Sequence, residues 1–167
     1  MAIDIVFKDA SIIIDLLKLK LFPKMLQLPF KFYTTDFIVN EIVDKEQKIL
    51  LDVFIEMNTI TIIESDSEDL DEISDIFNAV RKLSFADSSI IYFSQKMKAV
   101  IFTSDGLLRK IALDKKIEVH GILWIFEKLI EYHIITKNIA RKKLTELLQI
   151  NSYLPKEECE KYLKKWK

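Results

Sequence analysis

The segment Val100–Gly106 has the sequence VIFTSDG, in which an apolar run ends in a turn-like Thr-Ser-Asp-Gly. A second segment, Ile3–Ser11, has a similar organisation in IDIVFKDAS, where an acid again follows β-branched and aromatic residues. Short apolar runs bounded by turn residues predict buried strands. Ligands of open α/β sheets bind beyond the carboxyl ends of the strands, so Asp9 and Asp105 are predicted to face a shared site.

Three more strand-like runs follow this pattern, and helical patterns separate them. The predicted strands are Ile3–Phe7, Phe30–Thr34, Thr59–Ile63, Val100–Thr103 and Ile117–His120. Helices are predicted over 11–20, 36–57, 84–98, 106–113, 122–132, 137–149 and 155–166, and another from a capping box at Ser65–Glu68 to about Leu83. Strands that alternate with helices predict an α/β fold with a mainly parallel sheet.

Composition narrows the class of protein. The chain has 167 residues, half of them apolar, which suits one globular domain, and its two glycines and three prolines argue against flexible linkers. Cys159 is the single cysteine, so an intramolecular disulfide is excluded and a reducing compartment is favoured. The first residues do not resemble a secretory signal, and the apolar runs are too short to span a bilayer. We therefore expect a cytoplasmic protein without a membrane partner.

Charge is distributed unevenly along the chain. From Lys137 to Lys167, nine Lys or Arg residues accompany four Glu residues, a net charge of +5; the whole chain carries −1, so residues 1–136 carry −6. Such a basic end can contact a phosphate backbone or an acidic partner, although a solvated helix face is the commoner explanation.

Four carboxylates, Asp9, Glu41, Asp87 and Asp105, are the candidate site residues. Each has a simpler explanation: Asp9 and Asp105 suit helix caps, Glu41 suits a helix surface, and Asp87 completes a capping box with Ser84. Their separations in sequence rule out local pairing, yet all four map to one end of the predicted sheet. Held together there, they would repel one another and take up protons unless a cation neutralised them.

Other residues compete for the same interpretation. Glu64 also follows a strand, and Asp15 and Asp44 lie in predicted helices. His120 and His133 could form the acid/base pair of a metal-independent nuclease, but structural roles are more common for such residues. Phosphate-binding loops are excluded because neither a GxxxxGK[ST] nor a GxGxxG motif occurs in the sequence.

The candidate acids lie in four segments: DAS at Asp9–Ser11, VNEI at Val39–Ile42, ADSSII at Ala86–Ile91 and IFTSD at Ile101–Asp105. In order and spacing, these segments resemble the acidic motifs of PIN domains. The resemblance covers roughly residues 3–120. VHGIL at Val119–Leu123 and the basic tail are similar to the extension of a prokaryotic PIN subgroup related to VapC-like toxins.

The resemblance implies a three-layer α/β fold with a five-stranded parallel sheet in the order 3-2-1-4-5 and extra C-terminal helices. Residues 1–121 would form the core, and residues 122–167 an extension packed on the same domain. Asp9, Glu41, Asp87 and Asp105 would bind Mg²⁺ or Mn²⁺ for hydrolysis of RNA phosphodiester bonds. Asp9 and Asp105 would ligate the metal directly, and strand three at the sheet edge would place Glu64 away from the site.

Accessory residues follow from the same resemblance. Thr103 matches the family's hydroxyl two residues before the last acid, and Ser11 lies near Asp9, so either could position water or phosphate. Phosphate contacts from Lys and Arg supply most of the affinity for RNA. The nearest candidates are Arg81, Lys82, Arg109 and Lys110.

We therefore predict a metal-dependent endoribonuclease that acts as the toxin of a toxin–antitoxin pair. An antitoxin protein and a second copy of the chain are its candidate partners. Two alternatives stay open: a PIN-like regulatory or binding module without catalysis, and a structure-selective DNA nuclease.

Overall fold

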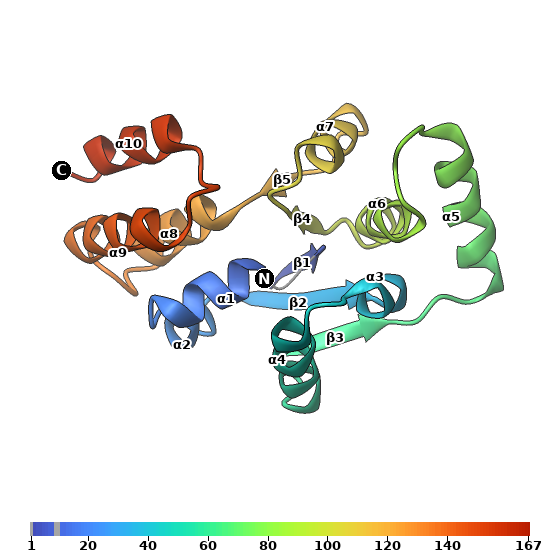
Figure 1. The fold of residues 1–167 in the computed structure, drawn as a ribbon, viewed down its shortest axis with the longest axis horizontal. Coiled ribbons are helices and arrows are strands. Elements are labelled where there is room, and N and C mark those ends of the chain that lie inside the picture. The colour runs from blue at the N-terminus through green and yellow to red at the C-terminus, as the bar shows by residue number, and fades with distance from the viewer. Residues whose placement is uncertain (1, 9–10) are drawn as a thin grey trace. The chain divides into compact units, whose positions relative to one another are not determined.

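The strands form one five-stranded parallel sheet in the order β3-β2-β1-β4-β5 (Figure 1). The computed structural model describes residues 2–8 and 11–167. The strands are β1 (Ile3–Phe7), β2 (Phe30–Thr35), β3 (Ile60–Ile63), β4 (Val100–Phe102) and β5 (Val119–His120). The predicted α/β class, the strands and their order are confirmed, and β3 lies at a sheet edge, so Glu64 follows an edge strand as expected.

Ten helices occur in the described parts of the chain. They are α1 (Ser11–Lys18), α2 (Phe22–Met25), α3 (Asp36–Glu41), α4 (Lys45–Glu56), α5 (Ser67–Ala79), α6 (Phe85–Met97), α7 (Gly106–Asp114), α8 (Ile122–Glu131), α9 (Lys137–Ile150) and α10 (Lys156–Lys165). Of these, α2 was not predicted. None of the described helices is long and apolar enough to cross a membrane.

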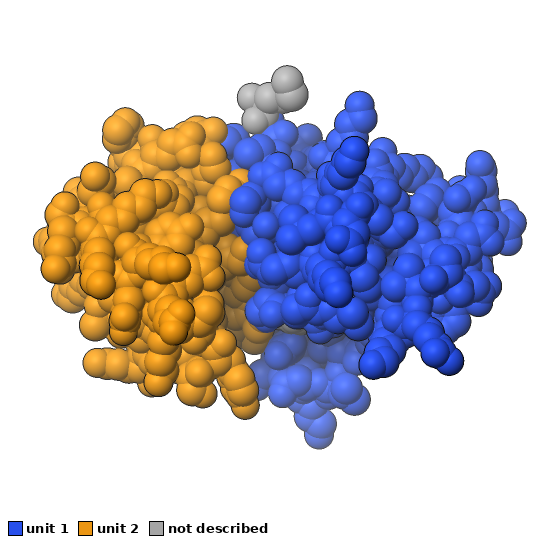
Figure 2. Space-filling model, turned by 90° about the horizontal axis from the view of Figure 1, so that it is seen from above, with its two compact units in different colours: residues 1–10, 29–120 blue, residues 11–28, 121–167 orange. Residues whose placement is uncertain are grey.

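The chain forms two compact units, which Figure 2 colours separately. Unit 1 comprises residues 1–10 and 29–120 and contains the sheet with α3 to α7; unit 2 comprises residues 11–28 and 121–167 and contains the other helices. The predicted division into a core over 1–121 and an extension over 122–167 stays a prediction.

The core of unit 1 lies between the central strands and their helices. Val6 of β1 and Ile101 of β4 are fully buried, which explains the apolar runs at Ile5–Phe7 and Val100–Phe102. Helix α6 packs on β1, β2 and β4, and α3 and α5 pack on α6. Further core residues are Ile38, Leu83, Ala86, Ile90, Ile91, Ala99, Leu108, Ala112, Ile117 and Val119.

The register of the central strands positions the candidate site. Phe7 of β1 is paired with Phe102 of β4, so both strands end at the same level. The Lys8 amide then donates to the Phe102 carbonyl at 3.3 Å. Lys8 and Thr103 consequently leave the sheet side by side at its carboxyl edge.

One long helix over 36–57 was predicted, and this prediction is wrong. Helix α3 ends at Glu41, Ile42 is extended with φ −69° and ψ 109°, and α4 starts at Lys45. The Asp44 side chain caps α4 by accepting from the Gln47 amide at 2.9 Å. An acid three residues before Gln is a start signal, which the continuous apolar pattern obscured.

The start and end of α5 also differ from the prediction. Its cap is Asp66, one residue later than expected: Asp66 accepts from the Asp69 amide at 2.8 Å, and Asp69 accepts from the Asp66 amide at 3.1 Å. Ser65 instead donates its hydroxyl to Asp36 at 3.1 Å. The helix ends at Ala79, short of the predicted end.

Hydrogen bonds and an aromatic contact connect the helices within unit 2. The Phe126 and Trp166 rings pack with centroids 5.7 Å apart, and the Trp166 indole donates to Glu127 at 2.5 Å. Asn151 donates to Asp15 at 2.8 Å, which joins the link before α10 to α1. Asp15 therefore has a structural role within unit 2.

Candidate active site

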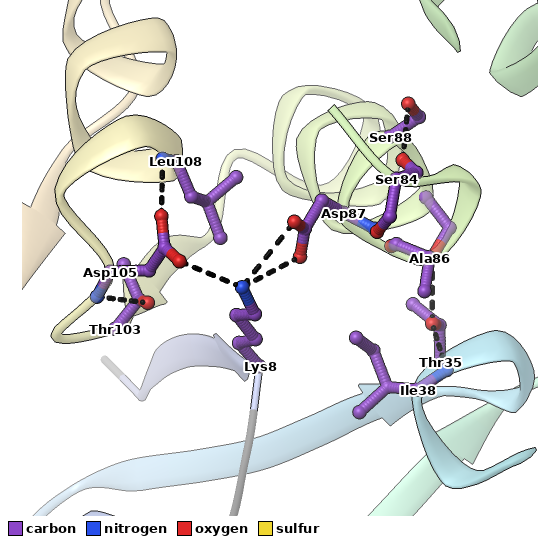
Figure 3. A network of polar contacts seen from close by, with 11 residues as sticks. Lys8, Thr35, Ile38, Ser84, Ala86, Asp87, Ser88, Thr103, Asp105 and Leu108 are labelled. Carbon is purple, nitrogen blue, oxygen red and sulfur yellow. Dashed lines mark hydrogen bonds and ion pairs between the residues drawn. The ribbon is translucent and has the colours of Figure 1, made fainter. Parts of the chain in front are cut away.

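A lysine side chain lies between two of the predicted site acids (Figure 3). The Lys8 ammonium is 3.0 Å from Asp105 Oδ2 and 3.3 Å from each carboxylate oxygen of Asp87. Three segments far apart in sequence meet here: the end of β1, the first turn of α6 and the loop from β4 to α7. Their meeting brings Asp87 and Asp105 together, as predicted.

Asp105 is both a helix cap and a member of this cluster. Its Oδ1 accepts from the Leu108 amide at 2.8 Å, so the carboxylate caps α7, while Oδ2 faces Lys8. The Leu108 hydrogen bond has the largest effect and lowers the pKa of Asp105; burial opposes it, and the hydrogen bond and charge of Lys8 lower the pKa further. Asp105 therefore caps α7 and contacts Lys8 at the same time.

Asp87 has a less favourable environment. Ser84 caps α6 as predicted, accepting from the Asp87 amide at 3.0 Å, but the Asp87 carboxylate faces Lys8. Asp87 is 8% exposed, and its buried Oδ1 accepts no hydrogen bond from any residue that the structure describes. Burial raises the pKa of Asp87, repulsion from Asp105 adds to the rise, and Lys8 only partly offsets them.

Glu41 is the last residue of α3, a helix held in place by a buried hydroxyl pair. Thr35 Oγ1 accepts from the Ile38 amide at 3.3 Å and lies 2.7 Å from Ser89 Oγ of α6. Ser89 donates its own hydroxyl hydrogen to a backbone carbonyl, so Thr35 donates to Ser89. This pair ties the helix that carries Glu41 to the helix that carries Asp87.

Glu41 and Lys8 line one hollow of about 270 Å³, together with Ile38, Ile42 and the start of α4. Glu41 as a residue is exposed, but its carboxyl is partly desolvated against this apolar lining. Desolvation raises the pKa of Glu41, and the negative charge of Asp87 raises it further against the effect of Lys8. The carboxyl is thus a better proton acceptor than an ordinary glutamate.

The sequence interpretation missed Lys8. Burial disfavours its ammonium form, but hydrogen bonds and charges from Asp105 and Asp87 outweigh burial and raise the pKa of Lys8. The available signal was a charged residue placed directly after a buried strand, next to a candidate acid. Asp9 itself lies outside the described residues.

The accessory residues fall into two groups. Thr103 is buried and accepts from the Asp105 amide at 3.0 Å, so its hydroxyl positions the acid, and Arg109 donates to the Thr103 carbonyl at 3.3 Å. Of the remaining predicted residues, Arg81, Lys82 and Lys110 are exposed, and Ser11 begins α1 in unit 2.

The two histidines do not form an acid/base pair within one unit. His120 Nε2 lies 2.6 Å from Glu118 in unit 1, whereas His133 belongs to unit 2 and is exposed.

The donor set suits a hard divalent cation. Within residues 2–8 and 11–167, no group of three or more acids, histidines or cysteines is close enough to hold a metal ion. Asp87 nevertheless has a buried carboxylate oxygen without a hydrogen bond, and the acids around Lys8 carry more negative charge than one ammonium neutralises. Carboxylate oxygens are the ligands that Mg²⁺ and Mn²⁺ prefer.

The sheet order and the acids at its carboxyl edge define an α/β domain of the PIN type. The model of the PIN domain family described as DUF3368 matches residues 5–167, and the chain belongs to this family. It is also similar to Endoribonuclease Nob1 of Pyrococcus abyssi (strain GE5 / Orsay), with 26% identity over 118 residues, 69% of this chain and 73% of that protein. The PIN resemblance is confirmed, while the VapC-like subgroup stays a prediction.

Proposed function

We propose that this chain is a metal-dependent endoribonuclease that hydrolyses RNA phosphodiester bonds. The observation that carries the proposal is the cluster of Asp87 and Asp105 around Lys8, with Glu41 in the adjoining hollow. Membership of the PIN domain family and similarity to a protein named as an endoribonuclease support it.

In this proposal Asp9 and Asp105 would ligate Mg²⁺ or Mn²⁺ directly, and Glu41 and Asp87 would hold water or a second ion beside it. The bound cation supplies Lewis-acid stabilisation of negative charge on the phosphoryl oxygens and lowers the pKa of a bound water.

The chain's own residues supply proton transfer and charge balance. Glu41, with its raised pKa, accepts a proton at its carboxylate from the attacking water, for which a pKa nearer the working pH is favourable. The bond from phosphorus to the leaving ribose oxygen breaks, and that oxygen takes a proton from solvent. The Lys8 ammonium offsets the charge of Asp87 and Asp105, so an anionic phosphodiester meets less repulsion on approach. Thr103 holds the Asp105 amide and thereby orients that acid.

The test is cleavage of an end-labelled single-stranded RNA by purified protein with Mn²⁺ and with Mg²⁺. Wild type is expected to cleave, Asp105→Asn to lose cleavage, and Asp75→Asn, which changes an exposed acid of α5, to cleave as wild type does. No cleavage with either metal, or equal cleavage by Asp105→Asn, would reject the nuclease and favour a binding module. Preferential cleavage of branched DNA in competition would favour the DNA nuclease.

We also propose, on the family resemblance, that the nuclease is the toxin of a toxin–antitoxin pair. Induced expression of wild type is then expected to arrest growth, and Asp87→Asn is expected to be tolerated. Equal growth of both strains would contradict the toxin role and leave the RNA cleavage assay to decide the chemistry. Copurification with a small partner protein and the mass of the purified chain in solution test the antitoxin and the homodimer.

A further inference from the structure

Unit 2 contains a second charged hollow, between α9 and α10, of about 420 Å³. Its lining includes four cations, Arg141 and Lys142 from α9 and Lys164 and Lys167 from the end of the chain, and one acid, Glu160. The lining side chains therefore carry a net charge of +3, four positive less one negative. The basic character noted in the sequence is concentrated around a hollow.

These four cations are not neutralised within the described chain. On the same two helices, Lys143 is paired with Glu146 at 3.3 Å and Lys165 with Glu127 at 2.6 Å. No described acid lies within ion-pair distance of the four lining cations. The Nε of Arg141 is buried and donates to no described acceptor, an arrangement that is costly unless an external acceptor reaches the guanidinium.

We propose that this hollow binds phosphate groups of an RNA backbone. A guanidinium presents donors in a fork that matches phosphate oxygens, and the lysines add point charges around it. The lining also includes Asn138, whose side-chain amide can donate to a further phosphate oxygen. Phosphate is the shared chemistry, and its assignment to RNA rests on the proposed nuclease function.

The charge distribution explains why the nuclease would need such a site. Residues 1–136 carry a net charge of −6 and repel RNA, whereas residues 137–167 carry +5. Counterion release from phosphate contacts supplies most of the affinity for RNA. The hollow therefore holds the substrate backbone, while the acids of unit 1 perform the chemistry.

The test compares two double variants that each remove two charges, one from each helix. Arg141→Gln with Lys164→Gln alters the hollow; Lys137→Gln with Lys161→Gln alters exposed lysines outside its lining. Binding of a labelled single-stranded RNA is measured by fluorescence anisotropy in EDTA over a range of KCl. The hollow variant is expected to bind about tenfold more weakly and to reduce the slope of log Kd against log salt by about 1.4, for two lost phosphate contacts.

The matched control is expected to bind with nearly wild-type affinity and slope. Equal losses in both double variants would show a diffuse attraction and overturn the site, as would wild-type binding by the hollow variant. Lys164→Gln alone, at an exposed position, repeats the test without risk to folding. Millimolar inorganic phosphate is expected to compete with RNA; polyglutamate that competes as well as RNA at equal charge would overturn the assignment in favour of an acidic protein.

Cleavage by the same proteins separates this inference from the nuclease proposal. The hollow variant is expected to raise KM with kcat unchanged. A chain that binds RNA through the hollow but never cleaves it would keep the site and reject the nuclease. A chain whose hollow variant cleaves with wild-type KM would keep the nuclease and reject the site.

Discussion

Two buried aspartates of unit 1, Asp69 and Asp87, differ in how well their charge is satisfied. They are 4% and 8% exposed, and each contacts a lysine. Asp69 accepts from Lys96 at 2.7 Å, from Tyr92 at 2.8 Å and from a backbone amide. These hydrogen bonds lower the pKa of Asp69 to about 2, and the bond from Lys96 has the largest effect.

Asp87 is also buried but has fewer donors. Lys8 is 3.3 Å away and shared with Asp105, and burial raises the pKa of Asp87. At Asp69 the hydrogen bonds outweigh the effect of burial, whereas at Asp87 burial outweighs the effect of Lys8, so the number and closeness of the donors decide how far burial is offset. An acid whose hydrogen bonds are all satisfied stabilises the fold. An acid with too few donors has a negative charge that is not fully balanced, and this charge can act on a cation or a substrate.

The largest expected effect on activity concerns Glu41, whose pKa is raised by burial as that of Asp87 is. Removing a proton acceptor typically reduces the rate by about 10² to 10⁴. Glu41→Gln is therefore expected to lower kcat for RNA cleavage by about that factor, with little change in the melting temperature. Glu46→Gln, on the exposed first turn of α4, is the control, and an equal loss there would remove Glu41 from the chemistry.

Exchanging the two aspartates for asparagine tests the comparison directly. Asp69→Asn is expected to lower the free energy of unfolding by about 2 kcal/mol, because charge-assisted hydrogen bonds are lost, and to leave the cleavage rate unchanged. Asp87→Asn is expected to lower the rate by about 10- to 100-fold and to leave stability at pH 7 equal or higher. Denaturant unfolding and cleavage are measured on both variants. Loss of stability in both, with activity kept in both, would break the distinction.

A substitution of Lys8 changes the positive charge at the candidate site. Its ammonium lies against the same carboxylates that would hold a divalent ion, so the two cations compete. Lys8→Gln is expected to bind Mn²⁺ at least about tenfold more tightly, since a unit charge a few ångströms away is unfavourable by a few kcal/mol near a protein surface. Mn²⁺ binding is measured by electron paramagnetic resonance, with the exposed Lys31→Gln as control. Unchanged affinity would place the metal elsewhere.

The sheet was predictable from sequence, and the ends of helices were less so. Strands such as Val100–Phe102 are buried on both faces and therefore stand out as uninterrupted apolar runs. The break after Glu41 was hidden because Ile42 and Val43 continue the apolar pattern without Gly or Pro. At α5 two overlapping capping patterns compete one residue apart, and the hydrogen bond of Ser65 to Asp36, distant in sequence, decides between them.

The proximity of Asp87 and Asp105 was predictable from the sequence, but the balance of charge around them was not. Local patterns explain Asp105 and Asp87 as cap residues, and both do stand at helix starts. Their pairing with Lys8 spans 97 and 79 residues and depends on the register of β1 against β4, which a linear pattern does not contain. The shortage of hydrogen-bond donors around Asp87 follows from that pairing and therefore could not be predicted from the sequence.

The smallest expected effect is on the pH dependence of the free energy of unfolding. Asp69 and Asp87 are expected to change it in opposite directions. The pKa of Asp69 falls from 3.8 to about 2 on folding, so its stabilising contribution is fully present above pH 3.8 and is lost as the pH falls toward 2. The difference in unfolding free energy between wild type and Asp69→Asn should shrink over this interval. Asp87, whose pKa is raised on folding, should show the opposite sign: its carboxylate destabilises the fold as the pH rises above the ordinary value, so wild type loses stability relative to Asp87→Asn. Denaturant unfolding of the three proteins from pH 2 to 7 measures both slopes, and slopes of the same sign would contradict the contrast between the two aspartates.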